Sequence, residues 1–293
     1  MNKDTLVNRG PLQDKLPEDA LESYHTHGYY RARNVLPEDL LQDAQILLEK
    51  WVDAQCTLWM QEGLLQEDFR DSDFRTRFHQ IWKAAGKPFY SRSPRKPLVA
   101  VDPERTFRIV RHPALLDLAQ YFIGTDELIS HGIWNSRPKS PDNALTDTPW
   151  HQDGQYFREQ AHIHIMTIWF PLHEVGPDSS CLAVSPDVQE SGLYENFEHA
   201  SGFIGMSRQD AKALKEVPVP MNRGDALCFP QLSPHRAMPN NTDQMRWSMD
   251  MRFVQTDKAM PPALDQGLIA RSQDPANLTS FEEWLGKWDV AGY

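Results

Sequence analysis

A histidine and an aspartate separated by one residue form the first pair in this chain that could do chemistry together. They are His151 and Asp153, within the stretch PWHQDGQYF. An imidazole and a carboxylate at this spacing could bind one metal ion, or they could be a polar patch on a loop. The motif is a weak signal by itself, because His-x-Asp often occurs by chance. A metal centre needs a third ligand from elsewhere in the chain.

That third ligand is available 84 residues after the first. His235 follows a predicted strand in LCFPQLSPHRAMP and opens a polar turn. Two histidines and one carboxylate on one side of a metal leave coordination positions open, which suits a non-haem Fe(II) that must hold a cosubstrate and O2 together. The spacing in a β-rich region therefore predicts a triad of His151, Asp153 and His235.

A strand with one polar face begins eleven residues beyond His235, at Arg246. Alternation would place Arg246, Ser248, Asp250 and Arg252 on one face, and Trp247, Met249, Met251 and Phe253 on the other. A guanidinium next to a metal could hold the distal carboxylate of a cosubstrate through two parallel hydrogen bonds. The polar face could also be solvated, and Asp250 with Arg252 could be a structural ion pair.

Composition and charge exclude several classes of partner. The 293 residues fit one large domain, and the formal net charge of −11 disfavours nucleic acid, anionic membranes and large polyanions such as acyl-CoA. Cys56, Cys181 and Cys228 are far apart and odd in number, which predicts no disulfide framework. The first residues resemble neither a secretory signal nor a transit peptide, and no stretch approaches the ~18 apolar residues of a membrane span. We expect a cytoplasmic protein that acts on a small molecule; its oligomeric state is not predicted.

Helices must brace the strands that carry these side chains. Residues 1–127 are predicted to be mostly helical: LPEDLLQDAQILLEKWVDAQ has Pro37 at its start and an apolar stripe, and HPALLDLAQYFIG runs from Pro113 to Gly124. The segment 88–106, rich in proline and basic residues, is predicted to be an ordered loop or a lid.

From about residue 128 to 254 the chain shows short alternating segments separated by turns rich in Pro, Gly, Asn and Asp. Many short strands with long connections predict a β-sandwich or jelly roll. The tail, 255–293, ends in a helix capped by Thr279 or Ser280. We expect residues 1–293 to form a single domain, with the N-terminal helices packed on a jelly-roll core.

These motifs together resemble the phytanoyl-CoA dioxygenase family of Fe(II)/2-oxoglutarate oxygenases. The resemblance extends from GYYRARNVLPEDLL to about residue 254, and it rests on WHQD and on a tryptophan 18 residues after the first ligand, Trp169. It implies a mainly β fold with helical support, whose core is a double-stranded β-helix, a cupin-like jelly roll. It also implies that the protein uses Fe(II), 2-oxoglutarate and O2. The implied reaction hydroxylates, or otherwise oxidises, a C–H bond of a small molecule and releases succinate and CO2.

The resemblance implies roles for individual residues. The iron ligands and catalytic residues would be His151, Asp153 and His235. Arg246 would pair with the far carboxylate of 2-oxoglutarate. Ser248 would add a hydroxyl contact, because Ala237 stands where members often carry Ser or Thr. Further cosubstrate contacts or walls are expected at Trp169, Asn135 and Arg137. The intact Asp153 argues against a halogenase, which replaces this acid with a small residue.

Substrate contacts have two interpretations each. Tyr156 and Phe157, just after the ligands, could form a substrate wall or belong to the core. Arg252 could bind an anionic substrate or serve only in an ion pair. The basic cluster at 92–96 is expected to be a solvated face, with a lid for an acidic substrate as the alternative.

Rival sites and functions remain open. His162 and His164 in HIHIM could chelate a metal, but a polar outer face is favoured because no acid lies at a matching position. A cupin-like Zn²⁺ or Mn²⁺ enzyme, or a non-catalytic ligand sensor, could use the same fold. Arg246 argues against the first and the intact triad against the second. A free amino acid, an alkaloid, a terpenoid or a polyketide would each fit as substrate, in amino-acid or natural-product metabolism.

Overall fold

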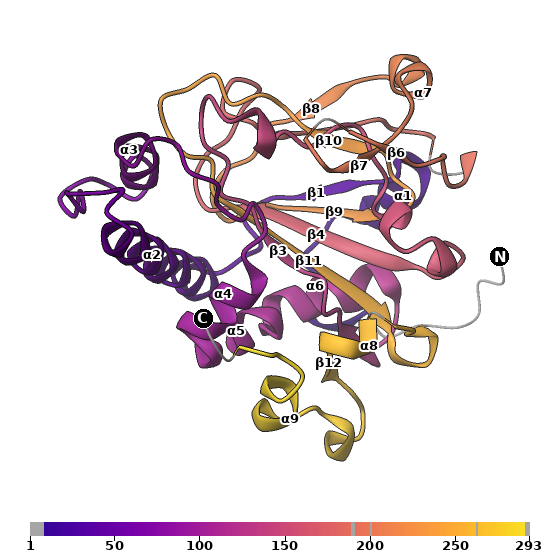
Figure 1. Ribbon diagram of the computed structural model, residues 1–293. Helices are drawn as coiled ribbons and strands as arrows, with labels where there is room; N and C mark the ends of the chain where they lie inside the picture. Colours follow the sequence, from indigo (N-terminus) through magenta and orange to yellow (C-terminus); the bar gives the residue numbers. More distant parts are fainter. Residues whose placement is uncertain (1–8, 189–190, 200, 262, 291–293) are drawn as a thin grey trace, which may run out of the picture.

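The main sheet forms the centre of the computed structural model, which describes residues 9–188, 191–199, 201–261 and 263–290 (Figure 1). Its strands follow the order β1-β9-β4-β11-β2-β12, with β3 paired to β11, and every pairing is antiparallel. The strands are β1 (Tyr30–Ala32), β2 (Leu128–Ser130), β3 (Asn135–Ser136), β4 (Ile165–Pro171), β9 (Ala226–Pro230), β11 (Ser248–Gln255) and β12 (Leu268–Arg271).

A smaller sheet packs against one face of the main sheet. Its order is β10-β5-β8, and a separate pair of strands lies in the same region. These strands are β5 (Leu182–Val184), β6 (Phe197–Glu198), β7 (Ile204–Gly205), β8 (Val217–Val219) and β10 (His235–Ala237). One cluster of buried side chains joins Leu182 and Val219 of the small sheet to Trp169 and Phe229 of the main sheet. Two antiparallel sheets that pack face to face form the predicted jelly-roll core.

Helices cover the opposite face of the main sheet, as Figure 1 shows for α2, α4, α5 and α6. The helices are α1 (Ala20–His27), α2 (Glu38–Gln61), α3 (Arg77–Ala84), α4 (Arg95–Val101), α5 (Pro103–Val110), α6 (Pro113–Ile123), α7 (Arg208–Ala213), α8 (Ala263–Gln266) and α9 (Phe281–Leu285). Methionines and aromatic residues of β11 share one buried cluster with leucines of α2 and α6. This shared core supports the proposal of a single domain, whose ends at 1–8 and 291–293 lie outside the described residues.

The longest predicted helices are confirmed. α2 begins at Glu38, directly after Pro37, and buries its apolar stripe. α6 begins at Pro113 and ends before Gly124, whose φ of 83° is the left-handed conformation that glycine adopts at low cost. α9 begins after Ser280, which forms a capping box with Glu283.

Two expectations about the elements need correction. The segment 88–106 is not a loop: it contains α4 and the start of α5, because Pro103 occupies a first-turn position and Asp102 caps the backbone N–H of Arg105. The main sheet also extends beyond residues 128–254, because β1 pairs with β9 and β12 pairs with β2. No helix among the described residues is long and apolar enough to span a membrane.

Candidate metal centre

Strands β4 and β11 build the inner face on which the site lies. Their register pairs Trp169 with Asp250 and Thr167 with Arg252. Successive side chains of a strand point to opposite faces, so all four point into the space between the sheets. The alternate residues Met249, Met251 and Phe253 are buried in the helix-side core, as predicted.

A backbone bridge holds the two histidines of the triad side by side. The N–H of His151 donates to the carbonyl of His235 at 3.0 Å, and the reverse hydrogen bond measures 2.9 Å. Their ring centroids are 4.1 Å apart. Asp153 follows two residues later, at the start of the short helix η3 (Asp153–Tyr156). Each of the three residues offers one ligand atom, and these atoms lie within 4.8 Å of one another.

Both imidazoles are held in the form that a metal requires. Nδ1 of His151 lies 2.9 Å from the carbonyl oxygen of Pro149, and Nδ1 of His235 lies 3.0 Å from that of Ser233. A carbonyl only accepts, so Nδ1 carries the proton and Nε2 keeps its lone pair. Burial lowers the pKa of His151 to about 3, with His235 adding to the effect, and burial also lowers the pKa of His235. Neutral imidazoles are available as ligands at neutral pH.

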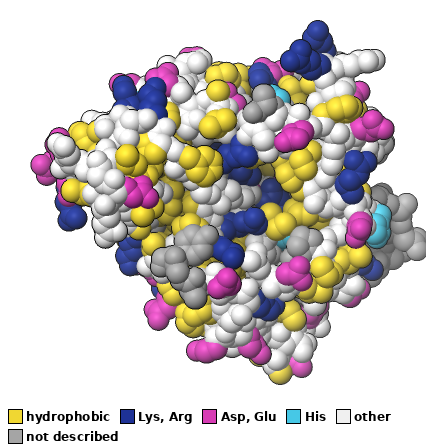
Figure 2. Space-filling view, viewed as in Figure 1, with side chains coloured by type: hydrophobic (Ala, Val, Ile, Leu, Met, Phe, Trp, Pro, Cys, Tyr) yellow, Lys and Arg dark blue, Asp and Glu magenta, His cyan; other side chains and the backbone are white. Residues whose placement is uncertain are grey.

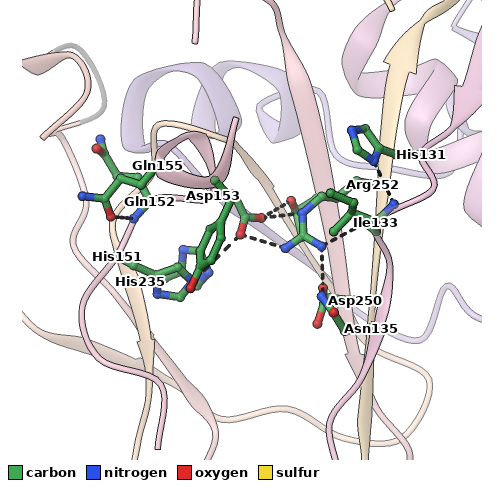
Figure 3. A network of polar contacts seen from close by, with 12 residues as sticks. His131, Ile133, Asn135, His151, Gln152, Asp153, Gln155, His235, Asp250 and Arg252 are labelled. Atoms are coloured by element: carbon green, nitrogen blue, oxygen red, sulfur yellow. Dashed lines mark hydrogen bonds and ion pairs between the residues drawn. The ribbon is translucent and has the colours of Figure 1, made fainter. Parts of the chain in front are cut away.

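The carboxylate of Asp153 faces the guanidinium of Arg252, as Figure 3 shows. Arg252 donates from Nη2 to Oδ1 at 2.7 Å and from Nε to Oδ2 at 3.1 Å, and the hydroxyl of Thr167 donates to Oδ2 at 2.6 Å. Burial alone would raise the pKa of Asp153, but Arg252 and His235 keep it far below the usual range of a carboxyl group. The carboxylate therefore remains ionised and could bind a metal.

The donor set fits a divalent metal that keeps open coordination positions. Two neutral imidazoles and one carboxylate suit Fe(II), and also Mn(II), Co(II) or Zn(II). The triad is the one cluster of this kind within the described ranges. The rival pair does not form a chelate, because His162 is exposed and Nε2 of His164 lies 2.9 Å from the hydroxyl of Tyr24.

A buried guanidinium shares the cavity with the triad. Arg246 is 3% exposed, and its Nη1 donates to the hydroxyl of Ser248. Among the residues that the structure describes, no carboxylate pairs with Arg246, and its Nε has no hydrogen-bond partner. Burial lowers its pKa to about 10, with Arg137 adding to the effect, so it stays charged at neutral pH. A buried cation without an anionic partner is costly unless a ligand supplies one, so the cavity is suited to a carboxylate.

The cavity between the sheets is small, with a volume of about 30 Å³ for the centres of water-sized molecules. Besides the triad and Arg246, it is lined by Arg137, Thr148, Thr167, Trp169, Leu182, Phe229, Ala237, Asp250 and Arg252. The sequence reasoning missed Thr148 and Thr167. Thr167 could have been found, because it lies two residues before Trp169 on the same face of a predicted strand. Thr148 carries no such signal.

Of the four residues predicted to contact or enclose the cosubstrate besides Arg246, two line the cavity and two do not. Trp169 lines the cavity, with its ring centroid 5.8 Å from the guanidinium carbon of Arg246. Ser248 accepts a hydrogen bond from that guanidinium, so it orients Arg246. Arg137 lines the cavity and pairs with Asp250 at 3.1 Å. Asn135 does not line it: its side chain donates to Asp250 and accepts from Ser93.

The structure places the three predicted substrate contacts in different surroundings. Phe157 is only 4% exposed and packs in a core cluster with Ile129 and Ile165, so it is not part of the cavity wall. Arg252 uses four of its five N–H donors on Asp153, Asp250 and the carbonyl of Ile133, so its charge is already neutralised within the site. Tyr156 is 41% exposed, and its ring lies edge-on to that of His151 at 6.0 Å, which is compatible with a wall at the mouth of the site.

The sequence is similar to proteins of one known family. Residues 24–248 match the family model described as phytanoyl-CoA dioxygenase (PhyH). The peroxisomal phytanoyl-CoA dioxygenase of Homo sapiens is 24% identical over 156 residues, which is 52% of this chain and 46% of that protein. A methylphosphonate hydroxylase of Gimesia maris is 32% identical over 103 residues, 35% of this chain and 37% of that protein. The chain thus aligns with less than half the length of either relative.

Solved structures share the fold. AviO1 from Streptomyces viridochromogenes Tue57 superposes with a TM-score of 0.56 at 22% identity, over 83% of this chain and 96% of that one. EvdO2 from Micromonospora carbonacea var. aurantiaca, complexed with 2-oxoglutarate, gives 0.56 at 19% identity, over 82% and 91%. The mainly β fold with a jelly-roll core and helical support is confirmed. Since the family model matches residues 24–248 of the 293, this chain belongs to the phytanoyl-CoA dioxygenase family.

Proposed function

We propose that this protein is an Fe(II)- and 2-oxoglutarate-dependent dioxygenase. One observation carries the proposal: a buried triad of two histidines and an aspartate shares its cavity with Arg246, a buried guanidinium that no described carboxylate neutralises. The triad provides a metal site, and Arg246 provides a place for the far carboxylate of a cosubstrate that chelates the same metal. Membership of the family supports this assignment.

Each residue has a defined task in this proposal. The metal ligands are His151 and His235, through Nε2, and Asp153, through a carboxylate oxygen. Arg246 binds the distal carboxylate of 2-oxoglutarate as a fork, and Ser248 fixes the plane of that fork. When bound, iron with 2-oxoglutarate and O2 supplies the oxidising chemistry, and succinate and CO2 are released.

The protein also keeps the centre dry. Leu182, Phe229 and Ala237 supply apolar lining to the cavity. Exclusion of water strengthens the pairing between Arg246 and a carboxylate, because charges interact more strongly where the local dielectric is low. Trp169 closes the cavity beside Arg246.

The reaction that we propose is hydroxylation of a C–H bond in a small-molecule substrate. One relative in the comparison is a hydroxylase, which supports this choice over other oxidations. A Zn²⁺ or Mn²⁺ enzyme with the same triad would have no use for Arg246, so the unpaired guanidinium favours the oxygenase.

Anaerobic reconstitution with Fe(II) and 2-oxoglutarate tests the proposal. We expect a weak visible charge-transfer band that is absent in His151→Ala and in His235→Ala. His162→Ala is the matched control, because this histidine is exposed and lies outside the site, and it should keep the band. A wild-type protein that shows no band and instead holds Zn²⁺ tightly would contradict the assignment.

A further inference from the structure

A second group of arginines lies beside the metal cavity, on the segment that leads into α4. The hydroxyl of Ser93 donates to the side chain of Asn135, which in turn donates to Asp250 on β11. Arg92 and Arg95, on either side of Ser93, are therefore held next to the strands that carry the site. Arg92 also donates to the carbonyls of Ser201 and Leu145, the latter at 3.0 Å.

Three guanidinium groups gather there. The guanidinium carbon of Arg92 lies 3.8 Å from the ring centroid of Phe203, and that of Arg137 lies 5.7 Å from the same centroid. Nη1 of Arg95 donates to the carbonyl of Gly132 at 3.5 Å, on the loop between β2 and β3, and Arg137 directly follows β3. Burial lowers the pKa of Arg95 to about 10, and Arg252 and Arg137 add to the effect. Arg137 lines the metal cavity, so the group continues outward from the centre where chemistry occurs.

The charges of this region do not balance. Asp250 pairs with Arg137 and Arg252, and Asp153 pairs with Arg252. Within the described part of the chain, neither Arg92 nor Arg95 forms an ion pair with a carboxylate. The metal cavity and the neighbouring segment thus contain five guanidinium groups and two carboxylates. The guanidinium groups are those of Arg92, Arg95, Arg137, Arg246 and Arg252, and the carboxylates are those of Asp153 and Asp250. A metal dication and the dianion of 2-oxoglutarate cancel each other in formal charge, so an excess of three positive charges remains.

This excess occurs in a chain with a formal net charge of −11. Lys and Arg side chains gather near the centre of the face shown in Figure 2, whereas Asp and Glu side chains are scattered over its periphery. Partial burial of several positive charges close together is unfavourable unless a negative charge compensates them. Such a group of arginines therefore indicates a binding site for an anion. The structure does not support the expectation of a purely solvated face at residues 92–96, because both arginines are only partly exposed.

We propose that the substrate is a small organic acid whose carboxylate or phosphonate group binds to Arg92 and Arg95, while its carbon skeleton passes Arg137 towards the metal. This inference rests on the proposed function. Guanidinium groups bind such oxyanions through parallel, charge-assisted hydrogen bonds. The ring of Phe203 lies against Arg92, which limits the orientations of its guanidinium plane. A fixed acid group at one end of the substrate would determine which carbon reaches the metal.

Calorimetric titration of the anaerobic Fe(II) protein, saturated with 2-oxoglutarate, tests this inference. The probes are methylphosphonate, acetate and the neutral analogue acetamide. We expect at least one of the two anions to bind and acetamide not to bind. The tighter anion identifies the kind of acid group. Saturation with 2-oxoglutarate occupies Arg246, so that anion binding reports on the second arginine group.

The key variant is Arg92→Gln/Arg95→Gln, and its matched control is Arg33→Gln/Arg158→Gln, which removes the same charge at exposed positions. Anion affinity should fall at least tenfold in the first and stay unchanged in the second, while both keep the charge-transfer band. If the double variant loses the band, the single variants Arg92→Gln and Arg95→Gln are measured instead. Each should lower the affinity for the anion at least threefold.

The experiment distinguishes a failure of the proposed function from a failure of the inference about the substrate. Absence of the charge-transfer band in the wild type contradicts the proposed function. A normal band with no binding of either anion, or with equal anion affinity in wild type and variants, overturns only the inference about the substrate.

Discussion

Arg252 holds the carboxylate of Asp153 with two hydrogen bonds, from Nη2 at 2.7 Å and from Nε at 3.1 Å, and it donates from Nη1 to Asp250 at 2.7 Å. One guanidinium thus fixes the carboxylate of a proposed metal ligand and neutralises a second buried carboxylate. Arg252 lines the cavity, but four of its five N–H donors are engaged by the protein, so we assign it as a positioning residue.

Arg252→Leu should therefore weaken both the fold and the metal site. The substitution leaves two buried carboxylates without their shared partner, and breaking such a pair costs about 3–5 kcal/mol. Loss of the group that orients a ligand lowers metal affinity about 10–100-fold. Urea unfolding of the metal-free protein and titration with Fe(II) or Mn(II) measure the two effects. Arg158→Leu, at an exposed site, should leave both unchanged, and equal metal affinity in Arg252→Leu and wild type would refute the positioning role.

Thr167→Val removes the other donor to Asp153 without changing the shape of the side chain. The hydroxyl donates to Oδ2 at 2.6 Å in a buried setting. A hydrogen bond to a charged group contributes about 1.5–3 kcal/mol, so we expect a loss of that order in the free energy of unfolding, together with weaker metal binding. The control is Thr57→Val, whose hydroxyl bonds only to a carbonyl on the exposed side of α2. Equal stability losses in the two variants would show that the contact to Asp153 has no special value.

A histidine outside the site makes stability depend on pH. His173 accepts a hydrogen bond from the backbone N–H of Trp247 at Nε2, at 3.1 Å, and its Nδ1 lies 2.9 Å from the carbonyl of Glu174. The contact at Nε2 requires the neutral ring, because a protonated nitrogen cannot accept, and burial lowers the pKa of His173 from 6.5 to about 4. Between these two values the unfolded chain binds a proton that the folded protein does not, so stability falls as pH decreases through this window.

His173→Gln should reduce this pH dependence. The amide can still accept from Trp247 but takes up no proton. The slope of unfolding free energy against pH between about 4 and 6.5 should be smaller than in wild type, by less than the limit of ~1.4 kcal/mol per pH unit for one proton. Chemical unfolding in EDTA at several pH values measures the slope. Parallel curves for the two proteins would mean that His173 is not protonated differently in the two states.

The polar face of β11 could be predicted because its evidence is local, and the pair His151 and Asp153 of the proposed triad was visible for the same reason. The spacing of His151 and Asp153, and the alternation from Arg246 to Arg252, are visible in the sequence itself. The same alternation, however, could not tell a substrate contact from an ion pair. Arg252 was placed on the correct face, but its partner Asp153 lies 99 residues away in the chain.

The helices at residues 95–110 and the strands β1 and β12 were missed for a related reason. Prolines obscured α4 and α5, although Pro103 occupies a first-turn position where its missing N–H costs nothing. β1 is only three residues long, and its pairing with β9 depends on tertiary contacts that no periodicity reveals. The placement of Arg92, Arg95 and Arg137 likewise depends on a tertiary contact, the hydrogen bond from Ser93 to Asn135 of β3.

The affinity of the Fe(II)-bound protein for 2-oxoglutarate, compared between wild type and Arg246→Ala, tests the central claim most directly. Removing a buried partner of a charge pair costs about 3–5 kcal/mol, so affinity should fall by roughly two orders of magnitude or more. Arg246→Lys should recover only part of it, because an ammonium lacks the fork. Arg236→Ala is the control, because this arginine follows His235 but pairs with Glu216 away from the cavity, and metal content should not change in any of these variants. A wild-type protein that does not bind 2-oxoglutarate, or an Arg246→Ala variant that binds it as tightly as wild type, would contradict the account.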